Sequence, residues 1–150
     1  MKSHNIRVTK IFTFDIAHAL YGYDGLCKNI HGHTYHLGVT ICGIPDSNIE
    51  NPKLGMVMDF GSLKDIINKT IIHKFDHVMV LNQLAGYAQN TDFLSEFERV
   101  VLVPFQPTCE NLLNHFVGIL LDYFRGDQSL VHVKLSETPT SYCEWCIEDH

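Results

Sequence analysis

The sequence predicts an α+β domain in which an antiparallel four-stranded sheet carries two helices on one face, in the order ββααββ. Segments that alternate apolar and polar residues lie near both ends of the chain, and two segments with helical periodicity lie between them. No repeat, low-complexity tract or linker interrupts the 150 residues. We therefore expect one domain over residues 1–150, because strands grouped around intervening helices are typical of α+β architectures.

The first two strands are predicted from their period-two alternation, which is typical of strands with one buried face. They cover residues 6–18 and 33–43, and a loop containing Gly22 and Gly25 joins them. The residues that share one side are Phe12, Phe14, Ile16 and His18 in the first strand, and His33, Tyr35, Leu37, Val39 and Ile41 in the second. Two such strands joined by a loop favour an antiparallel pair.

Two amphipathic helices follow from apolar residues spaced three and four apart. The first begins near Ser62 and runs for about a dozen residues, with Ser62 and Asp59 as alternative caps. The second begins after Thr108, which we expect to cap it, and ends before Gly126. The predicted buried residues are Leu63, Ile66, Ile67 and Ile71 in the first helix, and Leu112, Leu113, Phe116, Ile119, Leu120 and Tyr123 in the second.

The rest of the chain supplies the last strands and one irregular segment. Residues 130–137 alternate as a third main strand, and residues 141–147 form a short fourth strand. Residues 83–106 show no clear pattern apart from a short predicted strand at 100–103, directly before Pro104.

Composition excludes several classes of function. The 17 acidic and 11 basic residues give a net charge of −6, which argues against a nucleic-acid surface because such surfaces are built from clustered Lys and Arg. No segment approaches the ~18 apolar residues of a membrane span, and the first residues do not resemble a signal peptide. We expect a cytoplasmic protein whose five cysteines, an odd number, are reduced thiols.

The segment CKNIHGH (residues 27–33) contains the most specific chemistry in the sequence. His31 and His33 are two residues apart, so an extended chain directs both imidazoles to one side. His18 ends the preceding strand, and pairing of the two strands would bring the three imidazoles together. Three neutral histidines with a fourth position open suit a catalytic Zn²⁺. The alternative is that the two neighbouring histidines are ordinary loop residues.

Cys27 in the same segment has three possible roles. As a fourth ligand it would close the site and make the zinc structural. As a thiol beside a cation it would be activated as a base or nucleophile. The third possibility is a buried, unreactive thiol, which is common for free cysteine.

Three further candidates are ambiguous when taken alone. Asp76 and His77 are adjacent before an apolar run, an arrangement found in proton carriers but also without function. Glu137, at a strand end, can accept paired N–H bonds from a heterocycle, or it is a solvated charge. We interpret Cys143-x-x-Cys146 as incidental because a lone CxxC lacks the second pair of a zinc site.

The order of these motifs is similar to that of the 6-pyruvoyl tetrahydropterin synthase/6-carboxytetrahydropterin synthase family. The resemblance rests on FxFDIAH (12–18), CxxxHGH (27–33), GMVMDF (55–60), FDHVMVLN (75–82), PTCEN (107–111) and SETPTSYCEW (136–145), and it extends over residues 6–147. It implies the tunnelling fold (T-fold), with trimers stacked as a homo-hexamer and sites between subunits.

The resemblance also implies residue roles. His18, His31 and His33 would bind Zn²⁺. Cys27 would be the general base with Asp76 and His77 as its acid–base partners, and Glu137 would anchor the pterin ring.

The implied substrate is 7,8-dihydroneopterin triphosphate. The spacing CxxxHGH and the ending TSYCEW resemble the carboxy branch of queuosine synthesis, whereas the pyruvoyl branch resembles CxxxxxHGH. The implied reaction is a lyase reaction that forms 6-carboxy-5,6,7,8-tetrahydropterin, acetaldehyde and triphosphate. The alternatives are elimination of triphosphate to 6-pyruvoyltetrahydropterin, and a pterin-binding member without activity. The resemblance does not identify the residues that contact the triphosphate, and residues 83–106 depart from the family pattern.

Overall fold

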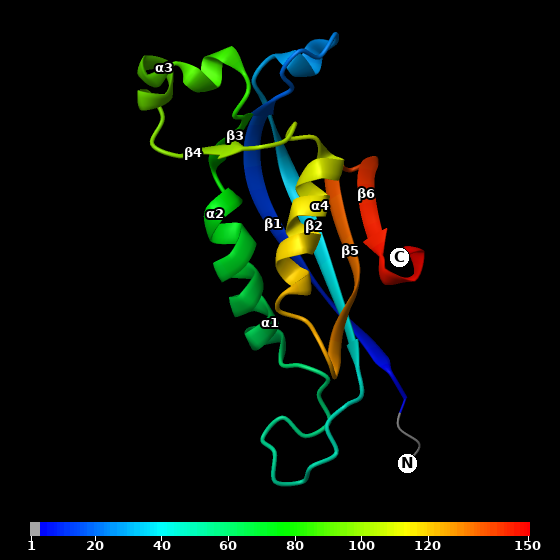
Figure 1. The fold of residues 1–150 in the computed structure, drawn as a ribbon. Coiled ribbons are helices and arrows are strands. Elements are labelled where there is room, and N and C mark those ends of the chain that lie inside the picture. The colour runs from blue at the N-terminus through cyan, green and yellow to red at the C-terminus, as the bar shows by residue number, and fades with distance from the viewer. Residues whose placement is uncertain (1–3) are drawn as a thin grey trace.

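A six-stranded sheet organises the computed structural model, which describes residues 4–150. The strand order within this range is β4-β3-β1-β2-β5-β6 (Figure 1). The strands are β1 (Ile6–Ala19), β2 (His31–Gly43), β3 (Val78–Asn82), β4 (Val100–Val103), β5 (Gln128–Thr138) and β6 (Ser141–Cys146). The central strands are the longest, so they provide the frame on which the other elements pack.

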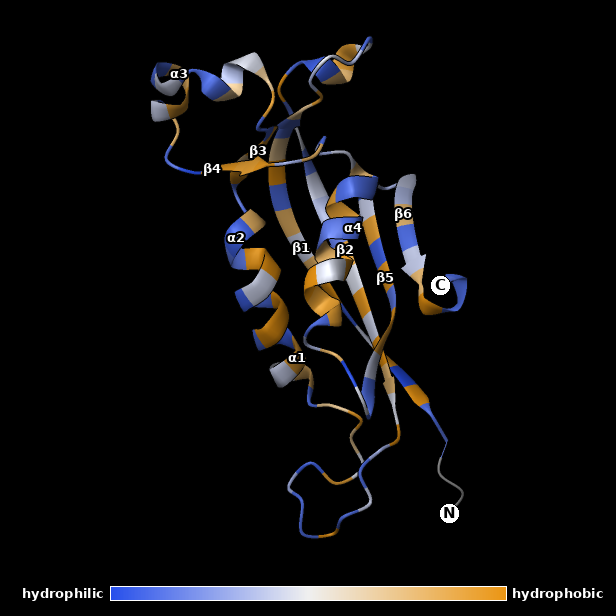
Figure 2. Ribbon diagram, viewed as in Figure 1, coloured by the Kyte–Doolittle hydropathy of each residue, from blue (hydrophilic) through white to orange (hydrophobic). Residues whose placement is uncertain are grey.

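The antiparallel pair of β1 and β2 was predicted and is confirmed. Its register runs without a break from Ile6 opposite Gly43 to His18 opposite His31. Hydrophilic and hydrophobic bands alternate along these strands in Figure 2, as expected for strands with one buried face. The register has a direct consequence for the site, because it places two of the predicted ligand histidines side by side.

The α+β class with helices on one face is confirmed, but the sheet has six strands rather than four and is mixed rather than antiparallel. β3 and β4 extend the sheet beyond β1, and both run parallel to it. The short strand at 100–103 was predicted, whereas β3 was not. All five residues of β3 are buried. A strand buried on both faces has no polar alternation to detect.

The first helical segment is longer than predicted. It comprises α1 (Phe60–Ile67), a π-helical turn η2 (Asn68–Ile72) and α2 (His73–Phe75). Of the two alternative caps, Asp59 is the one observed, since its carboxylate accepts hydrogen bonds from the N–H groups of Gly61 and Ser62. The segment ends at Asp76, so the helix leads directly into a predicted functional residue.

The second helix, α4 (Cys109–Leu121), begins as predicted, with Thr108 accepting from the N–H of Asn111. It ends five residues before Gly126, and Tyr123 lies beyond its end with half of its surface exposed. The irregular segment contains η3 (Gly86–Gln89) and α3 (Thr91–Ser95) before β4. η3 is a 3-10 turn, as are η1 (Leu26–Lys28) and η4 (Ile147–Asp149).

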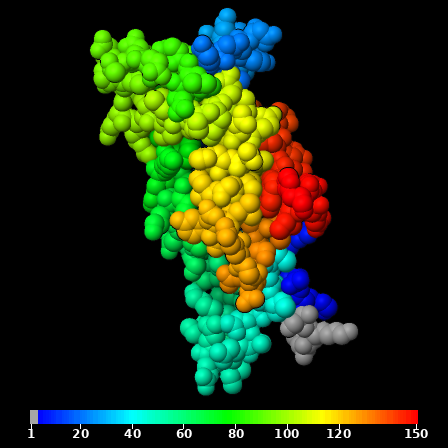
Figure 3. Space-filling view, viewed as in Figure 1, coloured from blue at the N-terminus to red at the C-terminus, as the bar shows by residue number. Residues whose placement is uncertain are grey.

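The hydrophobic core lies between the sheet and the helices α1, α2 and α4, which cover the same face (Figure 1). Phe14 stacks on Tyr35 with ring centroids 5.8 Å apart and meets Phe116 of α4 edge-on at 6.1 Å. Figure 3 shows that the loop between β2 and α1 projects at the opposite end of the molecule from α3. Among the described residues, no helix is long and apolar enough to cross a membrane.

Candidate metal centre and its surroundings

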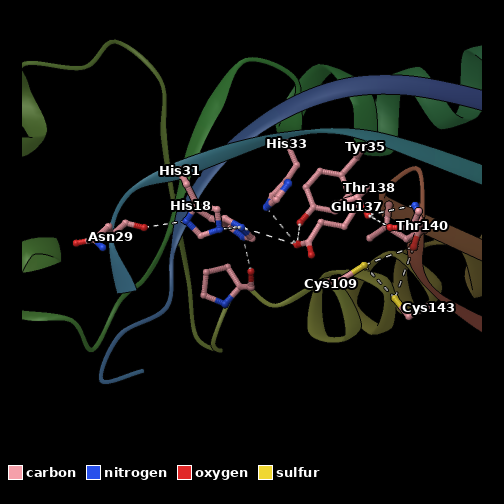
Figure 4. Close-up of polar contacts among 12 residues, drawn as sticks. His18, Asn29, His31, His33, Tyr35, Cys109, Glu137, Thr138, Thr140 and Cys143 are labelled. Atoms are coloured by element: carbon pink, nitrogen blue, oxygen red, sulfur yellow. Dashed lines mark hydrogen bonds and ion pairs between the residues drawn. The ribbon is translucent and has the colours of Figure 1, made fainter. Parts of the chain in front are cut away.

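Three imidazoles meet where β1 and β2 lie side by side. One ring nitrogen from each of His18, His31 and His33 lies within 4.8 Å of the other two. The Nε2 atoms of His18 and His31 are 3.1 Å apart, and Figure 4 shows the rings directed toward one another on the α4 side of the sheet. The structure therefore brings together the three residues that the sequence predicts as zinc ligands, and their role as ligands stays a prediction.

The other nitrogen of two of these rings is held by the main chain. His18 Nδ1 lies 2.7 Å from the carbonyl oxygen of Pro107, and His31 Nδ1 lies 2.8 Å from that of Asn29. A carbonyl can only accept a hydrogen bond, so each Nδ1 carries a proton, and in the neutral ring this leaves the lone pair on Nε2. Histidines that bind metals are oriented by such outer contacts.

Burial favours the neutral form of His18. The side chain is 2% exposed, and this burial lowers its pKa from the ordinary value against the opposing effect of the Pro107 carbonyl; the neighbouring His31 and His33 act in the same direction as burial. Neutral imidazole is the form that binds a metal ion. Three ring nitrogens that converge from two rigid strands fit Zn²⁺, and three ligands leave a fourth coordination position free for a substrate.

Glu137 lies beside the three histidines, at the end of β5. Its Oε1 atom is 3.8 Å from His18 Nε2 and 3.7 Å from His33 Nε2. The hydroxyl of Tyr35 donates a hydrogen bond of 2.7 Å to the same oxygen. Burial and this contact raise the pKa of Tyr35, which keeps the hydroxyl protonated as a donor. Tyr35 thus orients the carboxylate next to the three imidazoles (Figure 4).

Asp76 and His77 lie on the other face of the sheet. His77 Nδ1 is 2.8 Å from Asp76 Oδ1, so the two adjacent side chains are in direct contact. Their neighbour on β1 is Asp15, whose side chain alternates with that of His18 and therefore points away from the histidine cluster. Within one chain, the Asp76–His77 pair and the three histidines are separated by the sheet.

Asp15 holds this pair through several contacts. Its N–H donates to Asp76 Oδ1 at 3.0 Å, its carbonyl accepts from the N–H of His77 at 2.8 Å, and its Oδ2 is 4.0 Å from His77 Nε2. Thr34 donates to its Oδ1 at 2.6 Å. Partial burial would raise the pKa of Asp76, but the N–H of Asp15 and the ring of His77 together lower it.

The backbone at His77 is in the left-handed region, with φ of 54°. This conformation is uncommon for residues other than glycine and occurs often at functional sites. The hydrogen bond from its N–H to Asp15 helps to hold it there. The strained residue thus turns its ring back toward Asp76.

Cys27 lies in η1, within the loop that joins β1 to β2. Its carbonyl accepts a hydrogen bond of 2.8 Å from the N–H of Leu20, which ties this turn to the end of β1. In the part of the chain that the structure describes, the imidazole group does not include the Cys27 thiol. The structure therefore does not group the thiol with the three imidazole nitrogens, and the role of Cys27 stays a prediction.

Sequence reasoning missed Asp15 and Tyr35 as parts of these arrangements. Tyr35 was interpreted as a core residue, which it also is, because nothing local to it indicates that its hydroxyl reaches a residue 102 positions away. Asp15 interrupts the apolar residues of FDIAH, and a charge facing away from the core next to a candidate ligand was the available signal.

Two concave regions differ in their relation to these residues. A groove of about 660 Å³ lies on the open face beside His77, and Asp15, Thr34 and Arg99 also line it. A larger one of about 1000 Å³ is formed by the loop between β2 and α1, and it contains none of the predicted site residues. The smaller groove is therefore the one that bears on the predicted chemistry.

Comparison with known proteins gives matches along nearly the whole chain. The family model described as 6-pyruvoyl tetrahydropterin synthase matches residues 7–147. A Haemophilus influenzae protein named 6-carboxy-5,6,7,8-tetrahydropterin synthase is 36% identical over 143 residues, covering 93% of this chain and 97% of the relative. A Rickettsia felis protein of the same name is 32% identical over 141 residues, covering 93% and 99%.

Solved structures show the same fold. The Caenorhabditis elegans 6-pyruvoyl tetrahydropterin synthase superposes with a TM-score of 0.68 at 21% identity, covering 97% of this chain and 98% of that one. An uncharacterized Wolinella succinogenes protein gives a TM-score of 0.75 at 18% identity, with 97% and 99% coverage. These likenesses confirm the predicted T-fold. Together with the match over residues 7–147, they lead to one conclusion: the chain belongs to the 6-pyruvoyl tetrahydropterin synthase family.

Proposed function

We propose that the chain is a zinc-dependent lyase that converts 7,8-dihydroneopterin triphosphate to 6-carboxy-5,6,7,8-tetrahydropterin, acetaldehyde and triphosphate. The observation that carries the proposal is the meeting of three imidazoles beside the Glu137 carboxylate. The names of the Haemophilus and Rickettsia relatives and the short CxxxHGH spacing support the carboxy product. The expected context is cytoplasmic queuosine precursor synthesis.

The proposed roles of the metal centre follow from its geometry. His18, His31 and His33 would hold Zn²⁺, which when bound lowers the pKa of hydroxyl groups that coordinate it. Glu137, oriented by Tyr35, would accept N–H bonds from the pterin ring and fix the side chain of the substrate at the open coordination position. The 26% exposure of the Glu137 side chain leaves it accessible to a ligand.

The proposed proton transfers use the remaining residues. Cys27 would remove a proton from the side chain of the substrate as general base. His77 would return or relay a proton, with its ring orientation fixed by Asp76 and the pair positioned by Asp15. Breakage of the carbon–carbon bond in the side chain of the substrate would then release acetaldehyde.

A complete site would require a second chain, because one chain has the Asp76–His77 pair and the three histidines on opposite faces of its sheet. We therefore include a homo-hexamer, built as a dimer of trimers, in the proposal. Its mass in solution would be six times the 17.1 kDa of one chain. Light scattering coupled to size exclusion measures this value, and a monomeric active enzyme would contradict the shared site.

Complementation gives a sharper test of the shared site. Cys27→Ala and His77→Ala subunits are each expected to be inactive, but co-expression would place an intact Cys27 beside an intact His77 in about one quarter of randomly mixed sites. Recovery of turnover in the mixture supports sites formed between chains. If the mixture stays as inactive as its parents, the two residues act within one chain or not together.

The central experiment combines metal content, turnover and product. Purified protein is expected to contain zinc, and mass spectrometry of the products should show 6-carboxytetrahydropterin with acetaldehyde. Cys27→Ala should keep zinc and folding but lose turnover, whereas the matched control Cys42→Ala, another half-buried cysteine, should keep all three. Loss of zinc in Cys27→Ala would mean that the thiol is a ligand.

The second candidate function is the pyruvoyl reaction on the same substrate, which eliminates triphosphate without carbon–carbon cleavage. Two observations support this alternative: the matching family model is described as 6-pyruvoyl tetrahydropterin synthase, and the Caenorhabditis elegans structure has the same name. Pyruvoyltetrahydropterin without acetaldehyde would establish this alternative. Pterin binding without any turnover by the zinc-loaded protein would indicate an inactive member of the family.

A further inference from the structure

Two cysteines outside the proposed active-site roles lie in contact with each other. Cys109 is the first residue of α4, and Cys143 faces it from β6, with their Sγ atoms 3.2 Å apart (Figure 4). Thirty-four positions separate them in the sequence, so no spacing rule for cysteines would pair them. The CxxC spacing of Cys143 with Cys146 points to a different partner from the one that the fold provides.

The pair is fixed by the elements that carry it. Cys143 lies opposite Leu135 in the register of β5 and β6. The carbonyl oxygen of Leu135 is 3.4 Å from Cys109 Sγ and 3.9 Å from Cys143 Sγ, so both thiols gather at one main-chain group. A disulfide needs 2.03–2.05 Å between sulfurs, so closure requires an approach of about 1.2 Å. Small rotations of the two side chains, one at the start of α4 and one within β6, can supply this.

The two thiols differ in character. Their contact lowers the pKa of Cys143, while the same contact and burial raise the pKa of Cys109. Both residues are half-buried rather than enclosed. Cys143 is thus the more readily ionised member of the pair, and a small oxidant can reach it.

We propose that Cys109 and Cys143 form a redox-active dithiol, a site of reversible disulfide formation that ties the start of α4 to β6. With hydrogen peroxide, the Cys143 thiolate attacks one oxygen, the O–O bond breaks and hydroxide leaves, giving a sulfenic acid. Cys109 then loses its proton to hydroxide, and its sulfur attacks that of Cys143. The S–O bond breaks as the S–S bond forms, and the hydroxide that leaves takes up the proton that Cys143 released on ionising. Two thiols are oxidised, and one peroxide is reduced to two waters.

Mass spectrometry tests the proposal on the full-length, zinc-loaded protein. After treatment with a few equivalents of hydrogen peroxide, one disulfide should lower the protein mass by about 2 Da. Alkylation with N-ethylmaleimide in denaturant should then leave two of the five cysteines unmodified. Trypsin should yield peptide 100–125 joined to peptide 135–150. Dithiothreitol should restore both free peptides.

Two further measurements assign the bond. Cleavage after glutamate separates Cys143 from Cys146, because Glu144 lies between them, so the linked residue is identified in the wild-type protein without any mutation. Cys146→Ser should keep the cross-link and Cys143→Ser should abolish it. Oxidation that leaves only sulfenic, sulfinic or sulfonic acids overturns the proposal, as does a cross-link through Cys146. The readout is independent of turnover, so it does not depend on the proposed lyase activity.

Discussion

Replacing Tyr35 by phenylalanine isolates the single hydrogen bond that orients Glu137. The hydroxyl is fully buried and donates to Oε1 at 2.7 Å. A hydrogen bond to a charged group contributes about 1.5–3 kcal/mol when no other partner replaces it. Glu137 is 26% exposed, so water recovers part of this energy, and we expect a loss of about 1 kcal/mol. The ring is kept, so the core packing should change little.

The expected consequence is weaker pterin binding. One kcal/mol corresponds to about a fivefold change in an equilibrium constant, so KM for the pterin substrate should rise about fivefold while the zinc content stays the same. Steady-state kinetics and metal analysis measure the two quantities. The control is Tyr142→Phe, since this ring is 55% exposed on β6. Equal KM values for the Tyr35→Phe, Tyr142→Phe and wild-type proteins would refute the idea that the hydroxyl orients the carboxylate.

Three other predictions concern turnover, pH dependence and packing. Asp15→Asn should lower kcat about tenfold with KM and zinc content unchanged, because it releases the contact with His77. Asp15→Glu keeps the charge and should recover part of the lost kcat. Equal losses of kcat in both variants would argue against a role of Asp15 in positioning His77. Burial, with Lys74 nearby, lowers the pKa of His115 below its ordinary 6.5, so the unfolded chain binds an extra proton below that pH. His115→Leu should therefore reduce the drop in melting temperature between about pH 7.5 and about pH 5.5, and an unchanged drop would contradict this. Phe116→Ala should cost about 3–5 kcal/mol in chemical denaturation, whereas Leu121→Ala, at the exposed end of α4, should cost far less.

The strands with one exposed face could be predicted because their side chains alternate between core and solvent. β1, β2 and β5 all show this pattern, and their elements were found to within a few residues. β3 was not predicted because each of its five residues is buried, so no alternation of polar and apolar residues distinguishes one face of the strand from the other. The end of α4 was predicted too late because Tyr123 keeps the apolar spacing although it lies outside the helix.

The candidate site also contains residues whose proximity could be predicted from the sequence and residues whose proximity could not. His18, His31 and His33 could be brought together from the sequence because strand pairing turns their spacing into proximity. The contacts of Tyr35 with Glu137 and of Cys109 with Cys143 join residues 102 and 34 positions apart. Such contacts depend on how β5 and β6 pack beside α4, and no pattern of neighbouring residues in the sequence predicts that packing. Asp15 could be predicted in part: the alternation of the strand gives the face to which its side chain points, but not its contact with His77.

One strand, β1, carries residues of both arrangements, since His18 faces the other two histidines and Asp15 faces His77 on the other side. Three positions separate them, an odd number, which is what places them on opposite faces. Removing one residue between them would reverse the face of everything on one side of the deletion. The length of this short segment is therefore constrained more tightly than its composition, and we expect Ile16 and Ala17 to tolerate substitution by other residues of similar size far better than any insertion or deletion.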